Sequence, residues 1–438
     1  MRGDTGRVAE LTTGEKYRRY VMTSFVSGIE PVEFERASGA TVEAADGKRY
    51  LDLFSGISVV NAGHRHPVVA EAVKRQVDRY FHCASYIYYS RPVADLAERL
   101  AQVAPGHLEK TFFCNSGAEA VEGAIRLAKA VSGKTELIAL QMAFHGRTNA
   151  TLSVTGNMAR KSRGGPYLPG VAFAPAPYSY RCRFCAGACT LACADALEDT
   201  IRFQTSGDVA AFVAEPVLGE GGIVVPDRGY FRRVREILDR YGILFIDDEV
   251  QTGFGRTGTL FAVEQFGVEP DIMAMAKGIA DGFPLGGFIA ADGIADAFRP
   301  GEHLSTFGGN PVCCAAGLAN LEVMQAEHLP ERSAALGERA LVRLRALTEE
   351  SSLVGEVRGL GLMIGIELVL DRDSKEPAAA AAAEVRRHCR EHGVLVGVGG
   401  QLGNVVRIQP PLVISEEELD EGLEVVARGL ARAGESTT

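Results

Sequence analysis

The stretch GILFIDDEV at residues 242–250, followed by IMAMAKG at residues 272–278, decides the fold of this 438-residue chain. Each stretch opens with a short apolar run; the first run leads into Asp248 and the second ends on Lys277. Short apolar runs bounded by turn residues are typical of strands that are buried on both faces of a parallel sheet. Ligands of open α/β sheets bind beyond the carboxyl ends of such strands. The two runs therefore predict an α/β fold in which a carboxylate and an amine reach one shared site.

The setting of Lys277 favours a reactive amine over a solvated surface group. Apolar surroundings lower the pKa of a lysine amine, and the neutral amine is then a nucleophile toward carbonyl carbons. Asp248 places a carboxylate where it can hold a pyridinium nitrogen in its protonated form, and Asp247 stands beside it. An amine that attaches a carbonyl compound and an acid that holds a ring nitrogen are the two groups that pyridoxal phosphate chemistry requires.

The same region also resembles a known family. DEVQTGFGRTG at 248–258 and AKGIADGFPLGG at 276–287 are similar to the class III (omega) aminotransferases of pyridoxal phosphate (PLP) fold type I, with a pattern nearest to 4-aminobutyrate aminotransferases. The similarity extends over nearly the whole chain. It implies an α/β fold with a mostly parallel seven-stranded sheet in a large domain and a smaller α+β domain. The register of the DEVQ motif also selects Asp248 over Asp247.

We expect the chain to divide into three segments. Residues 1–65 are assigned to an N-terminal segment and part of the small domain, residues 66–325 to the large PLP-binding domain, and residues 326–438 to the C-terminal small domain. In the last segment, charged, alanine-rich helices expected at 331–350 and 377–392 alternate with short strands. A chain of this length is too long for one small core.

The cofactor contacts begin with the turn NSGA at residues 115–118, which leads into a predicted helix. Free amides at a helix N-terminus and a glycine that permits close approach are suited to a phosphate group. The resemblance gives Phe144, in the motif FHGRT, a stacking role on the pyridine face. It gives Gln251 a bond to the phenolic oxygen and Glu215 a scaffolding role. The implied cofactor-binding residues are Ser116, Gly117, Ala118, Phe144, Glu215, Asp248, Gln251, Lys277 and Thr306, of which Lys277 and Asp248 are catalytic.

The expectation of a homodimer rests on Thr306. It lies in LSTFGGNP at residues 304–311, which resembles the loop whose threonine reaches the cofactor of the neighbouring subunit. The resemblance therefore implies a homodimer, or a dimer of dimers, with shared active sites.

The resemblance also assigns substrate binding, to Ile57, Arg147, Glu220 and Arg407. Arg147 corresponds to an arginine that binds a distal carboxylate, and Arg407 to one that binds the α-carboxylate of glutamate. Glu220 corresponds to a residue that masks the second arginine when no α-carboxylate is present, since an unpaired buried charge is costly. Ile57 stands where the ornithine branch has a tyrosine, which favours 4-aminobutyrate over ornithine. The implied reaction moves an amino group from a 4-aminobutyrate-like donor to a 2-oxo acid such as 2-oxoglutarate.

Other reactions on the same fold stay open. YRCRFCAGAC at residues 180–189 resembles an insertion found in a subgroup that includes amino-acid racemases. Decarboxylation of dialkylglycines is a third outcome, because fold alone does not fix the reaction. A cofactor-free binding subunit is disfavoured, since Lys277 and Asp248 are both present.

Four cysteines lie close together in the sequence, spaced C-x2-C-x3-C-x3-C: Cys182, Cys185, Cys189 and Cys193. Four thiolates can complete a structural zinc site, but such sites usually consist of two separated CxxC pairs. No metal is therefore assigned, and a surface segment with reduced thiols or a disulfide is the alternative.

The composition excludes several classes of partner. A net charge of −10 argues against nucleic acid and anionic membranes. The first residues carry no apolar signal segment, and no apolar stretch approaches the roughly 20 residues that span a bilayer. We therefore expect a cytoplasmic enzyme that acts on small molecules.

Overall fold

A computed structural model describes residues 11–22, 28–185 and 188–435. At its centre lies a seven-stranded sheet in the order β4-β10-β9-β8-β7-β5-β6. Only β10 runs antiparallel to its neighbours, so the predicted mostly parallel sheet is confirmed. Its strands are β4 (Lys110–Cys114), β5 (Glu136–Leu140), β6 (Val171–Ala174), β7 (Val209–Ala214), β8 (Leu244–Asp248), β9 (Ile272–Met275) and β10 (Gly286–Ala290).

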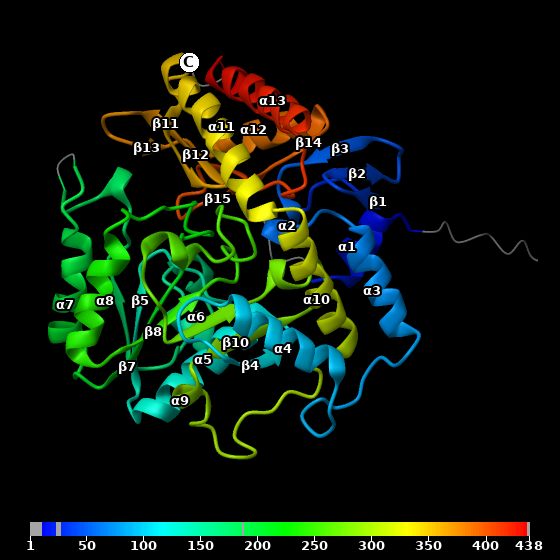
Figure 1. Cartoon of the computed structure of the whole chain (residues 1–438). Coiled ribbons are helices and arrows are strands. Elements are labelled where there is room, and N and C mark those ends of the chain that lie inside the picture. The colour runs from blue at the N-terminus through cyan, green and yellow to red at the C-terminus, as the bar shows by residue number, and fades with distance from the viewer. Residues whose placement is uncertain (1–10, 23–27, 186–187, 436–438) are drawn as a thin grey trace, which may run out of the picture.

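Helices cover both faces of this sheet (Figure 1). On one face lies α5 (Gly117–Ser132), which packs against β9 and β10. The other face shares its core with α3 (Pro67–Val77), α4 (Arg91–Val103), α7 (Ala192–Gln204), α8 (Tyr230–Tyr241) and α10 (Pro311–Ala326). Two shorter helices of this part are α6 (Asn149–Val154) and α9 (Asp292–Ala295).

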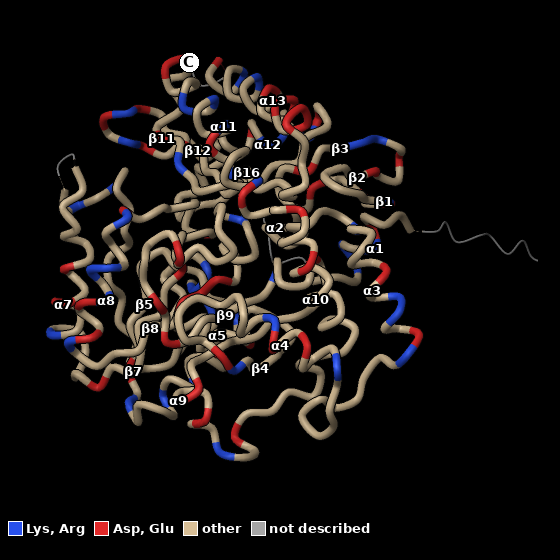
Figure 2. The backbone as a smooth tube through the Cα atoms, in the orientation of Figure 1, with Lys and Arg blue, Asp and Glu red and all other residues tan. Residues whose placement is uncertain are grey.

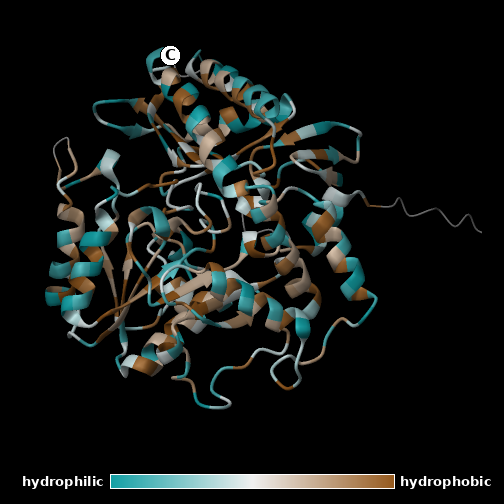
Figure 3. Cartoon of the chain, in the orientation of Figure 1, coloured by the Kyte–Doolittle hydropathy of each residue, from teal (hydrophilic) through white to brown (hydrophobic). Residues whose placement is uncertain are grey.

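The alternation of side chains along each strand explains why the sheet has an apolar core on both of its faces. In β5, Leu137 and Ala139 belong to the core under α5, whereas Ile138 and Leu140 belong to the core on the opposite face. Successive side chains of a strand point to opposite faces, so a strand buried on both must be apolar throughout. Figure 3 shows the outer helices alternating between hydrophilic and hydrophobic residues, as helices with one buried side do.

A second body lies above the seven-stranded sheet in Figure 1 and combines the two ends of the chain. The five-stranded sheet has the order β11-β12-β16-β15, with β13 paired to β12. A four-stranded sheet has the order β1-β2-β3-β14, in which β3 pairs in parallel with β14. The strands are β1 (Phe34–Ser38), β2 (Thr41–Ala44), β3 (Arg49–Asp52), β11 (Val354–Leu360), β12 (Met363–Asp371), β13 (Glu376–Pro377), β14 (Val394–Leu395), β15 (Gly397–Gly399) and β16 (Val405–Ile408). The helices are α1 (Thr13–Tyr20), α2 (Ser55–Ser58), α11 (Leu329–Glu350), α12 (Ala379–Glu391) and α13 (Glu416–Glu435).

The pairing of β3 with β14 brings an early strand beside a late one. This arrangement is compatible with the expected domain boundaries at residues 65 and 325, which stay a prediction. Charged side chains are spread over the outer helices of both bodies (Figure 2). Across the described part of the chain, no helix combines the length and the apolar character needed to cross a membrane.

Candidate active site

Lys277 and Asp248 lie at the ends of two neighbouring parallel strands. Asp248 is the last residue of β8, and it pairs in register with Ala274 of β9, three residues before Lys277. Burial lowers the pKa of Lys277, although the carboxylates of Asp248 and Glu215 oppose this shift. Lys277 also has a φ of 48°, in the left-handed region, where a non-glycine residue is strained. The structure thus places a carboxylate and a readily deprotonated amine together.

Asp248 is held by a histidine that the sequence analysis did not single out. Nδ1 of His145 lies 2.7 Å from Oδ2 of Asp248, and the amide of Val250 donates to Oδ1 at 3.1 Å. Burial opposes protonation of His145, but the hydrogen bond and charge of Asp248 outweigh it, so the pKa of His145 is raised. His145 follows Phe144 directly in the FHGRT motif, so a polar residue after the end of β5 was the available signal.

The predicted phosphate turn lies at the start of α5. Ser116 is the N-cap, and its hydroxyl accepts a hydrogen bond from the amide of Glu119 at 3.3 Å. The backbone here is closely approached, because a Cβ on Gly117 would lie 2.7 Å from Val250. The first amides of the helix, at Gly117 and Ala118, have no acceptor within the helix. This end of α5 therefore offers the free amides that an anion requires, and only glycine fits at residue 117.

Glu215 joins two loops beside the site. Its carboxylate accepts hydrogen bonds from the amide of Phe144 at 2.9 Å and from the amide of Gly219 at 2.8 Å. Burial raises the pKa of Glu215 to about 7, with the charge of His145 opposing the shift. Glu215 therefore fixes the backbone of the residue predicted to stack on the cofactor.

Gln251 connects the strand-end loop to the segment that contains Ile57. Its Oε1 accepts a hydrogen bond at 2.9 Å from Gln409, whose Nε2 also lies 2.7 Å from the hydroxyl of Ser58. Ile57 has a φ of 72°, which is strained for a β-branched residue. The chain of contacts through Gln409, which the sequence analysis missed, brings residues 57 and 251 into one region.

Glu220 lies between two arginines. Its Oε2 is 3.0 Å from Nη1 of Arg407 on β16, and its Oε1 contacts Nη2 of Arg160. Burial alone raises the pKa of Glu220, but the charges of Arg407 and Arg160 outweigh burial and lower it overall. The side chain of Arg407 also lies over the ring of Phe54, 5.4 Å from the ring centre. The pairing of Glu220 with Arg407 matches the prediction, whereas Arg160 was not predicted.

Arg147 and Thr306 lie at the surface of the chain. Ser305, beside Thr306, accepts a hydrogen bond from Asn115 at 3.4 Å, so the loop of Thr306 lies close to the phosphate turn. The same loop is bound to the segment before α4, because the hydroxyl of Ser85 donates to the carbonyl of Gly308 at 2.9 Å. Within the single chain, these two predicted residues are exposed rather than gathered around Lys277.

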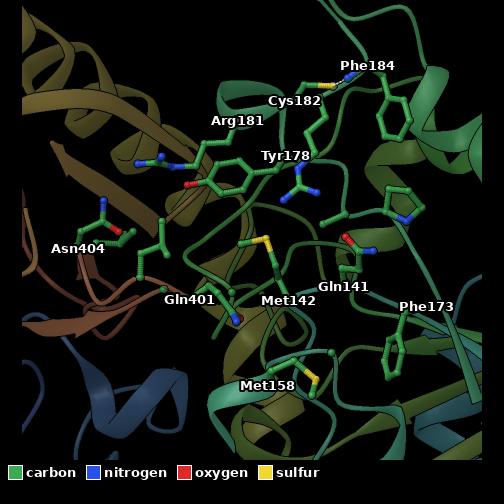
Figure 4. A pocket seen from close by; sticks show the side chains of 18 residues that line it. Gln141, Met142, Met158, Phe173, Tyr178, Arg181, Cys182, Phe184, Gln401 and Asn404 are labelled. Carbon is green, nitrogen blue, oxygen red and sulfur yellow. Dashed lines mark hydrogen bonds between the residues drawn. The ribbon is translucent and has the colours of Figure 1, made fainter. Parts of the chain in front are cut away.

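A cavity of about 510 Å³ lies beside the Glu220 loop. Gly221, Met158 and Val405 are in its wall, and these residues are near neighbours in sequence of Glu220, Arg160 and Arg407. Figure 4 shows Tyr178 and Arg181 on one side, with Met158 and Phe173 on the other. The cavity therefore lies beside the segments that carry the three paired charges.

The four clustered cysteines line a second, much smaller cavity together with Asp227. All four are free thiols, and the hydroxyl of Thr190 lies 3.2 Å from the sulfur of Cys185. In residues 11–22, 28–185 and 188–435, no group of three or more His, Cys, Asp or Glu side chains has an arrangement that could hold a metal ion. The alternative of a disulfide is not realised in the structure.

The residues around Lys277 fit PLP by their chemistry. Lys277 offers an amine of lowered pKa, and Asp248 offers a carboxylate fixed by His145. The start of α5 offers free backbone amides. These three features match the aldehyde, the ring nitrogen and the phosphate of the cofactor.

Comparisons with known proteins agree with this chemistry. The family model for class III aminotransferases matches residues 26–430. The chain is 42% identical to the acetylornithine aminotransferase of Methanothermobacter thermautotrophicus over 413 residues, covering 94% of this chain and 96% of the relative. It is 38% identical to a probable 4-aminobutyrate aminotransferase of Bacillus subtilis over 407 residues, covering 90% and 92%. The structure of an amine transaminase from an uncultivated Pseudomonas species, bound to PLP, matches with a TM-score of 0.90 and 34% identity, covering 95% and 99%.

Proposed function

We propose that this chain, which belongs to the class III aminotransferases, moves an amino group from an omega-amino acid such as 4-aminobutyrate to 2-oxoglutarate. The family and its solved structures establish a PLP-dependent aminotransferase. The choice of donor and acceptor is the proposal. It is carried by one observation: Glu220 is paired with Arg407 in the buried part of the site while Arg147 stays exposed.

The chemistry divides between cofactor and protein. When bound, PLP supplies an aldehyde that takes up the amino group and a ring that withdraws electrons from the substrate carbon. Lys277 would hold the cofactor through its amine, and the same amine, once released, would move the proton at the substrate carbon. Asp248, held in place by His145, would keep the ring nitrogen protonated. Phe144 would cover one face of the ring and exclude water.

The arginines select the substrates in this proposal. Arg147 binds the distal carboxylate that 4-aminobutyrate and glutamate share. With 4-aminobutyrate no second carboxylate enters, so Glu220 stays on Arg407 and neutralises it. With glutamate or 2-oxoglutarate, the α-carboxylate replaces Glu220 on Arg407. One site thereby accepts two arrangements of carboxylates in turn.

N-acetylornithine is the second candidate donor. The acetylornithine aminotransferase of Methanothermobacter thermautotrophicus shares 42% of its residues with this chain. Purified holoenzyme is incubated with 2-oxoglutarate and either 4-aminobutyrate, 5-aminovalerate or N-acetylornithine, and the glutamate formed is measured. The proposal requires the highest kcat/KM with 4-aminobutyrate. A higher value with N-acetylornithine would reassign the donor, and inversion of an L-amino acid without any 2-oxo acid would indicate a racemase.

We propose further that two copies of the chain share their active sites. Large apolar side chains are exposed on the run from residue 86 to 89 and at Phe307, which is 62% exposed. The rings of Phe307 and His82 lie 5.5 Å apart, so the loop of Thr306 and this run form one surface. A second copy covering it would bury the patch and bring Thr306 to the partner's cofactor. Sedimentation of the holoenzyme as a monomer at micromolar concentration would contradict this proposal.

A further inference from the structure

Arg160 gives Glu220 a second cationic partner. The two oxygens of the Glu220 carboxylate contact different arginines: Oε2 lies 3.0 Å from Nη1 of Arg407, and Oε1 contacts Nη2 of Arg160. The two arginines differ in their surroundings: the side chain of Arg407 is 5% exposed and that of Arg160 is 40% exposed. Glu220 thus bridges an arginine inside the site and an arginine at the surface.

The bridge bears on the step in which an α-carboxylate displaces Glu220 from Arg407. The Glu220 side chain is only 16% exposed, so a carboxylate released without a partner would lose its ion pair while still largely desolvated. Arg160 comes from another element, the 3-10 turn Met158–Lys161, and does not depend on Arg407 for its position. Glu220 can therefore leave Arg407 and still keep one charged partner.

A cavity of about 510 Å³ lies beside the segments that carry this bridge. Its wall contains Met158 and Gly221, which lie two residues from Arg160 and next to Glu220. Figure 4 shows Met158 and Met142 among the side chains that line this cavity.

We propose that Arg160 is a specificity-determining positioning residue that holds Glu220 after an α-carboxylate has displaced it from Arg407. This inference rests on the proposed function, because it requires substrates with and without an α-carboxylate. Arg160 touches neither the substrate nor the reacting atoms. It lowers the cost of unmasking Arg407, and so favours glutamate and 2-oxoglutarate without changing the binding of donors that lack an α-carboxylate.

The test compares two ligands that differ only at the α-carboxylate. 2-Oxoglutarate carries it, and levulinate has a methyl group in its place. Both bind the PLP form of the holoenzyme without an amino group to transfer, so calorimetry gives dissociation constants free of turnover. For Arg160→Gln we expect the Kd of 2-oxoglutarate to rise on the order of tenfold, which corresponds to ~1.4 kcal/mol. The Kd of levulinate should change less than about twofold.

Two further variants serve as controls. Arg160→Lys keeps the positive charge and should restore most of the affinity for 2-oxoglutarate. Arg163→Gln removes an exposed arginine from the same segment and should leave both dissociation constants unchanged. In Arg160→Gln, the single-turnover rate with glutamate should fall, whereas the rate with 4-aminobutyrate should stay nearly unchanged.

The possible outcomes separate the inference from its premise. One outcome is that wild-type enzyme binds 2-oxoglutarate more tightly than levulinate while Arg160→Gln raises both dissociation constants equally or lowers that of 2-oxoglutarate. In that case the role assigned to Arg160 is wrong and the proposed function stands. If wild-type enzyme binds levulinate as tightly as 2-oxoglutarate, Arg407 does not receive an α-carboxylate, and both proposals fail.

Discussion

Nδ1 of His145 and Oδ2 of Asp248 lie 2.7 Å apart, and both side chains are almost completely buried. Burial works against a charge on His145, yet the pKa of His145 is raised, because its hydrogen bond with Asp248 and the charge of that carboxylate outweigh burial. A buried carboxylate that is paired in this way is fixed in orientation. In the proposed function, this fixed orientation is what directs Asp248 toward a ring nitrogen.

The first prediction concerns the charge of Asp248. Asp248→Asn keeps the shape of the side chain but cannot stabilise a protonated ring nitrogen. We expect the variant to retain bound cofactor and to lose roughly 10²–10³-fold in kcat, the loss typical when one electrostatic partner of a developing charge is removed. Cofactor content and steady-state rates are measured on the same preparation. Near-normal turnover would show that another group serves the ring nitrogen.

The second prediction concerns the amine of Lys277. If Lys277 both holds the cofactor and moves the proton, as proposed, Lys277→Ala should lower the rate by at least about 10²–10⁴-fold. After borohydride reduction of the holoenzyme, peptide mass analysis should find the cofactor on Lys277 in wild type and on no lysine in the variant. The variant should keep the wild-type circular dichroism. Cofactor bound to a different lysine in wild type would refute the assignment.

The residues near the strand ends show which parts of the site could be predicted from the sequence. Strands β8 and β9 are apolar and bounded by turns, and these local features were sufficient to place Asp248 and Lys277 at one edge of a sheet. The resemblance to the family implied the mostly parallel seven-stranded sheet, and the observed strand order and pairing confirm it. Family and cofactor were confirmed by the family model and by a PLP-bound relative.

Contacts between distant segments could not be predicted in the same way. Arg160 and Glu220 are 60 residues apart in the chain, and Gln251 and Gln409 are 158 apart. No periodicity or spacing links such pairs, since only tertiary packing brings them together. His145 is the exception, because its place in FHGRT after the end of β5 was an available signal that the sequence analysis did not use.

The third prediction is a pH dependence of stability that comes from Asp281. Burial raises its pKa from 3.8 to about 7, although the amide of Ala62 donates to Oδ1. Between pH 3.8 and about pH 7, the folded chain therefore keeps a proton on Asp281 that the unfolded chain has already released. The free energy of unfolding should fall with rising pH across that window, by at most roughly 1.4 kcal/mol per pH unit from this group, and should level off above it.

Asp281→Asn provides the matched control for this slope. Asn accepts the same hydrogen bond from Ala62 and tolerates the left-handed backbone at this position, where φ is 47°. Urea unfolding of wild type and variant is measured from about pH 4 to pH 8. The difference in stability between them should change with pH below about 7 and stay constant above it; a difference that is the same at every pH would rule out the assignment.

The fourth prediction concerns the cysteine cluster. Hydrogen bonds from the side chain and amide of Thr190 lower the pKa of Cys185, whereas burial raises the pKa of Cys193 to about 12. Since the thiolate is the nucleophile, iodoacetamide near neutral pH should modify Cys185 on the order of tenfold faster than Cys193. Peptide mapping over time gives both rates. Thr190→Val should slow the reaction of Cys185 selectively, and equal rates in wild type would contradict the prediction.

The most direct test of the two-carboxylate site is single-turnover transfer of the amino group from glutamate and from 4-aminobutyrate to the holoenzyme. Arg407→Ala removes the partner of the α-carboxylate but leaves Glu220 paired with Arg160. The rate with glutamate should fall on the order of 10²-fold, as when one partner of a buried ion pair is lost, and the rate with 4-aminobutyrate should change less than about threefold. Arg147→Ala should slow both donors. Equal losses for the two donors in Arg407→Ala would contradict the assignment of Arg407 and the masking role of Glu220.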